Sequence, residues 1–203
     1  MELVFGTGNK HKGIELAEIL LPTGINLKTL ADFPNHIDVV EDGNSFGENA
    51  AKKATQQARH LNRWVLAEDS GISVPVLDGA PGIFSARFSG PDATDEKNNL
   101  LLLEKLAHFT NEKRTAFYTC HMVLSDPAGV VRFESEGRCY GRILTAPHGY
   151  NGFGYDPLFE VVEYHKTFGE LAPEVKRVIS HRARAGRQLI PKLYELIDRG
   201  ELK

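Results

Sequence analysis

The chain has 203 residues, of which 41% are apolar and 25% are charged, and its formal net charge is −3. These values are ordinary for a globular protein with a sizeable core, and we expect residues 1–203 to form a single domain. A slightly acidic chain is not expected to bind nucleic acid in bulk, because such binding usually needs a basic face. A local basic pocket for a polyanion remains compatible with this charge.

Neither a membrane segment nor an export signal is evident. No apolar run reaches the ~20 residues that span a bilayer, and the N-terminus lacks the basic and apolar regions of a signal peptide. We therefore expect a cytoplasmic protein with no membrane contact. Cys120 and Cys139 form no CxxC pair and lie in strand-like stretches. We interpret them as small buried residues, with a disulfide or a reactive thiol as the alternatives.

Strand-like and helix-like patterns alternate from the N-terminus, which predicts an α/β protein. Residues 3–5 predict a short buried strand, and residues 6–12 predict a loop that leads into a helix ending before Gly24. The sequence Ser45-Phe46-Gly47-Glu48 matches a capping box, so a helix should begin there. On that helix Glu48 and Lys52 are one turn apart and could pair, while Asn49 and Lys53 share the adjacent stripe.

The second half of the chain continues the alternation. Residues 64–67 predict a strand that delivers Glu68-Asp69-Ser70-Gly71 as an acidic turn, and residues 72–77 predict a return strand before a turn at 78–79. A leucine-rich helix is expected over about 95–108. Two strands, 115–125 and 130–138, should form an antiparallel ribbon around a turn at 126–129. The chain is then glycine-rich over 149–156 and helical over about 173–197, where Pro191 should kink or split the helix.

The first segment that could carry chemistry lies between the first strand and its helix. The N–H groups at a helix start favour phosphate, and the two lysines add positive charge. The segment is neither a Walker A loop nor GxGxxG. The alternative is a polar loop with solvated lysines. The residues concerned are Thr7, Gly8, Asn9, Lys10, His11 and Lys12.

A second candidate is acidic, and it consists of the pairs Glu41-Asp42 and Glu68-Asp69. Carboxylates on separate elements can converge at the edge of an α/β sheet. Such oxygen ligands, together with a phosphorylated substrate, suit Mg²⁺. The alternative for the first pair is favourable charge at a helix start. The second pair directly follows apolar residues, where carboxylates cost desolvation unless they are paired.

Two further candidates lie in the C-terminal third. The segment Gly149–Asp156 combines three glycines with aromatics, which suits close approach to a flat ligand and stacking on a base. The alternative is a loop whose aromatics pack on the core. Cations gather at Lys176-Arg177 and at Ser180–Arg184, where Ser180 could cap a helix. Because cations at a helix start are disfavoured by its dipole, an anion or a base is expected opposite them, unless the run is a solvated basic face.

Six motifs occur here in one order: Thr-Gly-Asn-x-x-Lys, Glu-Asn-Ala-x-x-Lys-Ala, Glu-Asp-Ser-Gly, Gly-Ala-Pro-Gly-Ile, Gly-Phe-Gly-Tyr-Asp-Pro and Ser-His-Arg. Together they resemble the inosine triphosphate pyrophosphatase family, also called the Ham1 family, over nearly the whole chain. The resemblance implies an elongated, two-lobed α/β fold with a long central mixed sheet flanked by helices and a substrate cleft between the lobes. It also implies a homodimer that uses Mg²⁺ to hydrolyse ITP, dITP and XTP to the monophosphate and pyrophosphate, which cleanses the nucleotide pool.

The resemblance also assigns residues. It implies that Asp69 is the proton acceptor and a metal ligand, with Glu41 and Glu68 as further metal-site residues. The turn reads Glu-Asp where Asp-Asp is common in bacterial members, so Glu68 would reach the metal at longer range. The substrate contacts implied are the loop Thr7, Gly8, Asn9, Lys10, His11 and Lys12, the phosphate contact Lys53, the contact Ser70, and the base-binding wall Phe153, Gly154, Tyr155, Asp156, Lys176, His181 and Arg182.

These assignments predict a mechanism in which Asp69 deprotonates a water for attack at the α-phosphorus, while Lys12 and Lys53 offset phosphate charge. Arg182 would donate to the 6-oxo group of the base and Phe153 would stack on it. Adenine would leave such a donor unpaired, but guanine shares the 6-oxo group, so its exclusion rests on the resemblance alone. Two alternatives stay open, a Maf-like pyrophosphatase for other nucleotides and a non-catalytic protein that binds nucleic acid through residues 176–187.

Overall fold

The structure is a computed structural model, and it describes residues 1–202. The chain combines a β-sheet with α-helices that flank it, which confirms the predicted α/β class. The strands are β1 (Glu2–Phe5), β2 (Asn26–Thr29), β3 (Val65–Ser73), β4 (Thr115–Ser125), β5 (Val131–Ile143), β6 (Phe159–Val161) and β7 (Lys166–Thr167). The α-helices are α1 (Lys10–Leu20), α2 (Phe46–Leu61), α3 (Asp95–Leu106), α4 (Pro173–Ile179) and α5 (His181–Asp198).

The seven strands form one sheet in the order β2-β1-β3-β4-β5-β6-β7. Strand β1 pairs in parallel with β2 and β3, whereas β6 pairs antiparallel with β5 and β7. The sheet is therefore mixed, as expected. Within residues 1–202, no helix combines the length and apolar composition that crossing a membrane requires.

The chain divides into two compact units. Unit 1 consists of residues 1–69, residues 120–137 and the chain from His181 onward, and unit 2 consists of residues 70–119 and 138–180. Strands β3, β4 and β5 each contribute residues to both units. The expectation that residues 1–203 form a single domain stays a prediction.

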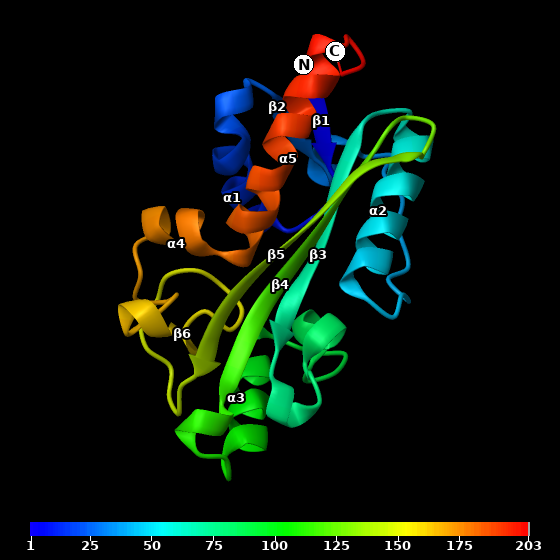
Figure 1. Cartoon of the computed structure of the whole chain (residues 1–203). Coiled ribbons are helices and arrows are strands. Elements are labelled where there is room, and N and C mark those ends of the chain that lie inside the picture. The colour runs from blue at the N-terminus through cyan, green and yellow to red at the C-terminus, as the bar shows by residue number, and fades with distance from the viewer. Residues whose placement is uncertain (203) are drawn as a thin grey trace. The chain divides into compact units, whose positions relative to one another are not determined.

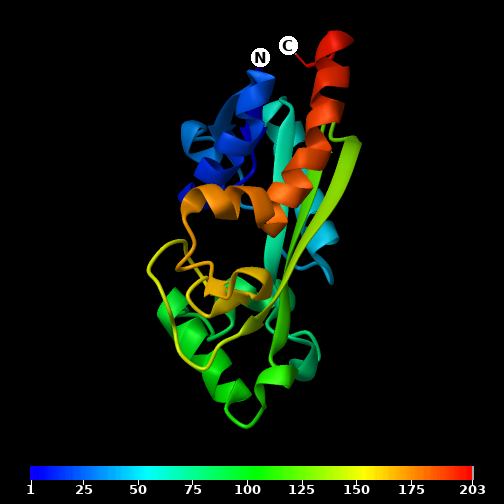
Figure 2. The ribbon, with the colours of Figure 1, turned by 60° about the vertical axis from the view of Figure 1, so that its left-hand side comes forward.

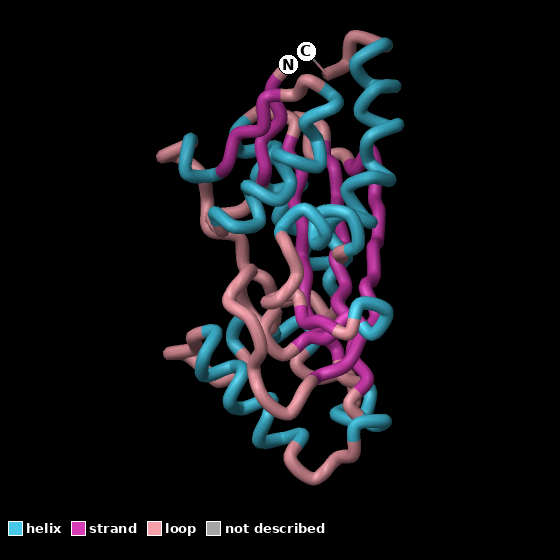
Figure 3. The backbone as a smooth tube through the Cα atoms, turned by 90° about the vertical axis from the view of Figure 1, so that its left-hand side faces the viewer, coloured by secondary structure: helices cyan, strands magenta, loops and turns pink. Residues whose placement is uncertain are grey.

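In unit 1 the sheet is covered on both faces. Leu66 and Met122 lie on the face that packs against Leu16 of α1 and Leu189 of α5. Ala67 and other small residues on the opposite face pack against α2. Figures 1 and 2 show α1 and α5 on one side of these strands and α2 on the other. Figure 3 shows α5, which ends near the label C, from a third direction. Such burial on both faces explains the continuous apolar runs of β1 and early β3.

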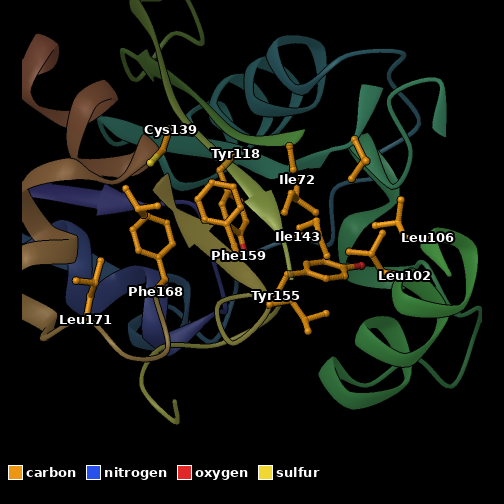
Figure 4. Packing of buried hydrophobic residues seen from close by; sticks show 14 residues of the cluster. Ile72, Leu102, Leu106, Tyr118, Cys139, Ile143, Tyr155, Phe159, Phe168 and Leu171 are labelled. Carbon is orange, nitrogen blue, oxygen red and sulfur yellow. The ribbon is translucent and has the colours of Figure 1, made fainter. Parts of the chain in front are cut away.

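The core of unit 2 is built largely from aromatic residues. The ring centroids of Tyr118 and Phe159 are 4.8 Å apart in an edge-on arrangement, and those of Phe159 and Phe168 are 5.2 Å apart and stacked. Leu102 and Leu106 of α3 belong to the same cluster (Figure 4). Both cysteines are buried free thiols, which confirms their interpretation as small core residues.

Helix α2 begins as its capping signal predicts, because Ser45 Oγ accepts a hydrogen bond from Glu48 N at 3.2 Å. The reciprocal bond is displaced by one residue: the Glu48 carboxylate accepts from Asn44 N at 2.8 Å rather than from the cap residue itself. Lys52 pairs with Asp42. These contacts fix the start of α2, which carries Asn49 and Lys53.

The predicted turn at Glu68–Gly71 and return strand at 72–77 are wrong. Strand β3 continues through Ser73, and Pro75–Leu77 form a 3₁₀ helix. Gly71 is present for close packing: an added Cβ would lie 2.4 Å from Ser85 Oγ and 2.5 Å from the Gly82 carbonyl oxygen. Because Ser85 and Gly82 are distant in sequence, the local pattern around Gly71 predicts a turn instead of a strand. The turn at Asp78-Gly79 is confirmed, and both residues have positive φ.

Two other boundaries differ from the predictions. Strand β5 was expected to end at Arg138 but continues to Ile143. The C-terminal helical segment is split at Ser180 rather than at Pro191, which lies inside α5. Pro191 is exposed. Water can therefore bond the Arg187 carbonyl that loses its helical donor, so the helix tolerates the proline there.

Candidate active site

Glu68 and Asp69 are consecutive residues of β3, so their side chains point to opposite faces of the sheet. Both are buried, with exposed fractions of 2% and 8%. Each carboxylate is held by its own set of partners within unit 1. We call these sets the Glu68 cluster and the Asp69 cluster.

The Glu68 cluster contains Arg182, Lys12 and Cys120. Arg182 binds the carboxylate through two parallel hydrogen bonds, from Nε to Oε2 at 2.8 Å and from Nη2 to Oε1 at 2.7 Å. Lys12 Nζ lies 3.1 Å from Oε1, and the Cys120 thiol donates to Oε2 at 3.2 Å. The third guanidinium nitrogen, Nη1, bonds Glu15. Such paired, charge-assisted bonds are the strong form of an arginine–carboxylate contact.

This environment lowers the pKa of Glu68. Burial alone would raise that pKa, but the nearby charges of Arg182 and Lys12 outweigh burial and hold the pKa well below its usual value. Burial and the adjacent Glu68 carboxylate raise the pKa of the Cys120 thiol well above its usual value. Glu68 is therefore a fixed anion, and Cys120 is a neutral hydrogen-bond donor rather than a reactive thiolate.

The Asp69 cluster contains Asn49, Lys53 and Glu41. Asn49 Nδ2 donates to Asp69 Oδ2 at 3.1 Å, and Lys53 Nζ lies 3.4 Å from Oδ1. The same ammonium group donates to Glu41 Oε2 at 2.7 Å. Asn49 and Lys53 are four residues apart on α2, and this spacing places both on the face that meets β3. One helix face thus holds the carboxylate at two points.

The balance of effects on Asp69 is the opposite of that on Glu68. Burial and the negative charge of Glu41 raise the pKa of Asp69, and they outweigh the lowering effects of Lys53, Asn49 and Lys12. A carboxylate whose pKa is raised by burial is a better proton acceptor than an ordinary aspartate. Of the two neighbours, Asp69 has the properties expected of a general base.

The predicted phosphate loop, residues 7–12, is partly helical, because α1 begins at Lys10. Asn9 is its N-cap: Asn9 Oδ1 accepts from Lys12 N at 3.2 Å, and Thr7 Oγ1 accepts from Asn9 N at 3.1 Å. Gly8 to His11 are exposed, whereas Lys12 turns inward to Glu68. The segment is therefore an ordered helix start, and its role as a phosphate-binding loop stays a prediction.

Residues Gly149–Asp156, which we call the glycine-aromatic loop, are held from several sides within unit 2. Asp156 Oδ2 accepts from Phe153 N at 2.9 Å and from Lys176 Nζ at 2.6 Å. The Lys176 ammonium also lies 4.7 Å from the centre of the Phe153 ring. Tyr155 packs in the core and Tyr150 is fully exposed. Tyr155 is thus buried and Phe153 is half-buried over a cation, and the assignment of both to the base-binding wall stays a prediction.

The cationic run near the C-terminus is mostly not a solvated face. Lys176 lies in unit 2, while His181 and Arg182 open α5 in unit 1, and all three side chains are buried. The expectation of an anion opposite the helix start is confirmed, and the anions are the protein's own Glu68 and Glu15. The prediction that Arg182 reads the base stays a prediction, because this structure places its guanidinium against these two carboxylates.

Within residues 1–202, no three His, Cys, Asp or Glu side chains are grouped closely enough to hold a metal by themselves. Glu41 and Asp69 both contact the Lys53 ammonium, so their carboxylates approach one common point. Two carboxylates supplemented by substrate phosphates are a donor set that suits Mg²⁺. Both Glu68 oxygens are already bonded within its cluster, and direct ligation by Glu68 stays a prediction.

Comparison with known proteins identifies the family. The model of the Ham1 family matches residues 3–192 of this chain. The chain belongs to the Ham1 family. It is 55% identical to a dITP/XTP pyrophosphatase from Rhodopirellula baltica, over 97% of this chain and 95% of that protein. It is 48% identical to a dITP/XTP pyrophosphatase from Exiguobacterium, over 93% of this chain and 95% of that protein.

Solved structures agree with the Ham1 assignment. The Ham1 protein of Staphylococcus aureus superposes with a TM-score of 0.85 at 36% identity, covering 96% of this chain and 99% of that one. The HAM1 protein of Coxiella burnetii gives a TM-score of 0.87 at 36% identity, with the same coverage. The resemblance inferred from the motifs is therefore confirmed at the level of family and fold.

Several residues of the two clusters were not predicted from the motifs. Glu15 is three residues beyond Lys12 on α1, so it shares a helix face with that lysine. Asn49 was placed on the same stripe as Lys53 but was given no role. Cys120 is correctly predicted to be a small core residue, but nothing in the sequence indicates that its thiol bonds a buried carboxylate.

Proposed function

We propose that this chain hydrolyses dITP, ITP and XTP to the nucleoside monophosphate and pyrophosphate. The family assignment and the names of the full-length relatives support the substrate class. The observation that carries the proposed chemistry is Asp69, a buried carboxylate of raised pKa between Asn49 and Lys53.

In the proposed reaction a water attacks the α-phosphorus. Asp69 accepts the proton of that water as its oxygen bonds to phosphorus. The bond between the α-phosphorus and the oxygen bridging to the β-phosphorus breaks, and pyrophosphate leaves. Lys53 and Lys12 are held beside the carboxylates by ion pairs, and their charges would offset those of the phosphates.

We assign Mg²⁺ to Glu41 and Asp69, whose carboxylates share Lys53 as a neighbour. When bound, this ion would neutralise phosphate charge and polarise the reacting phosphoryl group. We assign Glu68 a positioning role, since it aligns Lys12 and Arg182. Residues 7–12 at the start of α1 are proposed as further phosphate contacts, and Ser70 is proposed as a further substrate contact.

The base end of the substrate is assigned to the glycine-aromatic loop. Phe153 offers a ring for stacking, and its backbone N–H is fixed by Asp156, which Lys176 holds in turn. Gly154, His181 and Arg182 are kept as proposed contacts of the base wall. The homodimer that the family resemblance implies remains a proposal, and so does the cytoplasmic location.

Product analysis tests the proposal directly. Incubation with dITP and Mg²⁺ should release pyrophosphate and dIMP, and removal of the metal with EDTA should stop the release. Orthophosphate as the first product would mean attack at the γ-phosphorus and would contradict the proposal. A panel with dTTP, UTP and GTP separates this activity from that of a Maf-like enzyme, because purines with a 6-oxo group and no 2-amino group should be preferred.

A further inference from the structure

The glycine-aromatic loop carries a glycine at its functional centre, between Phe153 and Tyr155. Gly154 has φ +63, a left-handed conformation that other residues rarely adopt, while an added Cβ would meet no described atom within 4 Å. The glycine is therefore required by its backbone angle rather than by space. Because glycine rotates easily about its backbone bonds, something outside the loop must fix the peptide planes on its two sides.

Two side chains of helix α3 fix these two peptide planes by hydrogen bonds. Asp95 Oδ2 accepts a hydrogen bond from Gly154 N at 2.7 Å, which sets the Phe153–Gly154 peptide. Asn99 Nδ2 donates to the Gly154 carbonyl at 3.0 Å, which sets the Gly154–Tyr155 peptide. Asp95 and Asn99 are four residues apart, so they project from one face of the helix. A single helical turn thus holds both polar backbone groups of the glycine.

The start of α3 does not need these side chains for its own stability. Thr94 is the N-cap, and Thr94 Oγ1 accepts from Lys97 N at 3.2 Å. Asp95 would gain a little from the helix dipole in any orientation at this position. The hydrogen bond between Asp95 and Gly154 therefore serves to hold the glycine-aromatic loop and is not needed to start the helix.

The neighbouring residue Asn98 anchors the same arrangement from a second side. Its Oδ1 accepts from Ser89 N and Ser89 Oγ, both at 2.8 Å, and its Nδ2 donates to the Ser85 carbonyl at 3.3 Å. That Ser85 carbonyl also accepts from the Tyr155 hydroxyl at 2.8 Å. The backbone of Gly154 and the side chain of Tyr155 are therefore both tied, directly or through Ser85, to the first turns of α3.

We infer that Asp95 and Asn99 are positioning residues that set how strictly the enzyme selects its base. The inference rests on the proposed function, because it assigns the base to the loop that these residues hold. Losing either bond frees one peptide plane beside Phe153, so the ring and the backbone groups next to it would no longer present one fixed surface to the purine. The phosphate contacts proposed in unit 1 and helix α3 belong to different units.

The test compares variants that remove one bond while keeping the size of the side chain. Asn99→Asp replaces the donor by a carboxylate that faces a carbonyl oxygen. It should raise the KM for dITP about tenfold, leave kcat within about twofold, and reduce the preference for dITP over dGTP. Asp95→Ala should act in the same direction, about fivefold. Asp95→Asn keeps an acceptor for Gly154 N and should retain more of the selectivity than Asp95→Ala.

Inorganic tripolyphosphate, which has no base, reports on the phosphate contacts alone. Its inhibition constant should be the same in wild type and in all three positioning variants. The matched control is Glu104→Gln, an exposed residue of the same helix, which should leave KM and selectivity unchanged. If Asn99→Asp does not fold, the comparison of Asp95→Ala with Asp95→Asn carries the same test.

The outcomes are distinguishable. A wild-type protein that releases no pyrophosphate from dITP would contradict the proposed function itself. An active wild type whose variants keep both KM and base preference would overturn the inference alone. A change in the tripolyphosphate constant in step with KM would also overturn it, because the substitutions would then be acting on the whole fold.

Discussion

The two faces of β3 in unit 1 each carry a buried carboxylate, and these two carboxylates differ in their partners and in their pKa. On the Glu68 side, a bidentate arginine, a lysine and a thiol bond both oxygens, and the pKa falls well below its usual value. On the Asp69 side, one amide and one shared lysine leave burial and Glu41 dominant, and the pKa rises. Burial is similar on both sides, so the number and geometry of the cations decide the direction.

The comparison separates structure from chemistry. A carboxylate saturated by fixed cations cannot exchange protons near neutral pH, and removing a cation leaves an uncompensated buried charge. A carboxylate with fewer partners is closer to accepting a proton. We therefore expect substitutions in the Glu68 cluster to act mainly on stability, and substitutions in the Asp69 cluster to act mainly on rate.

The largest effect on stability is expected from Arg182→Met. Glu68 would lose its bidentate partner while its carboxylate stays buried, which should cost about 3–5 kcal/mol in the free energy of unfolding. Urea denaturation at neutral pH measures this change. Arg187→Met removes an exposed arginine from the same helix and should stay within about 0.5 kcal/mol of wild type. The double variant Arg182→Met with Glu68→Gln should recover much of the loss, and a lack of recovery would mean that the ion pair is not its cause.

The next effect concerns rate. Asp69→Asn keeps the side-chain shape and the bond from Asn49 but removes the proton acceptor, so kcat for dITP should fall at least ~100-fold. The unfolding free energy should change much less than in Arg182→Met. Near wild-type turnover in this variant would remove Asp69 from the proposed role. A loss of stability equal to that of Arg182→Met would erase the distinction between the two sides of the strand.

Local signals in the sequence predicted the parts of this arrangement that depend on neighbouring residues. The cap at Ser45 correctly predicted the start of α2, the spacing of Asn49 and Lys53 correctly placed both on one stripe of that helix, and the ordered motifs predicted the family. What the sequence could not show was set by distant partners. Gly71 lies in a strand because Ser85 packs against it, and Arg182 is buried because Glu68 lies opposite, 114 residues earlier.

The split of the C-terminal helix shows the same limit. Pro191 is a strong local signal for a break, but its exposed position lets water replace the lost bond, and α5 continues through it. The contacts of Asp95 and Asn99 could not be predicted from the sequence either, because a spacing of four residues is common on helices. Only the position of Gly154 in the structure shows that both side chains bond to it.

The two sides of β3 should also differ in the pH dependence of stability. The folded pKa of Glu68 is below its unfolded value of 4.5, so its contribution is complete above that value and is lost as pH falls below it. The folded pKa of Asp69 is above its unfolded value of 3.8, so its contribution is present at low pH and is lost as pH rises through the folded value. Denaturation of wild type, Glu68→Gln and Asp69→Asn across acid pH measures both trends.

The difference in unfolding free energy between wild type and Glu68→Gln should therefore shrink as pH falls below 4.5. The unfolding free energy of Asp69→Asn should instead increase relative to that of wild type as pH rises above 3.8. Parallel pH profiles for the two variants would show that both carboxylates have the same kind of environment, which would contradict the structure. An inverted order would mean that Asp69, not Glu68, is the fixed anion.

The smallest effect is expected at Cys120, the neutral member of the Glu68 cluster. Its thiol is one of several donors to the carboxylate, and the side chain is fully buried. Cys120→Ala removes that donor and leaves a small cavity, at a cost of about 1–2 kcal/mol by denaturation. Cys120→Ser restores a donor of similar size and should recover part of the loss, which separates the hydrogen bond from the packing. A serine variant no more stable than the alanine variant would assign Cys120 to packing alone, and Arg182 and Lys12 would then suffice to keep Glu68 charged.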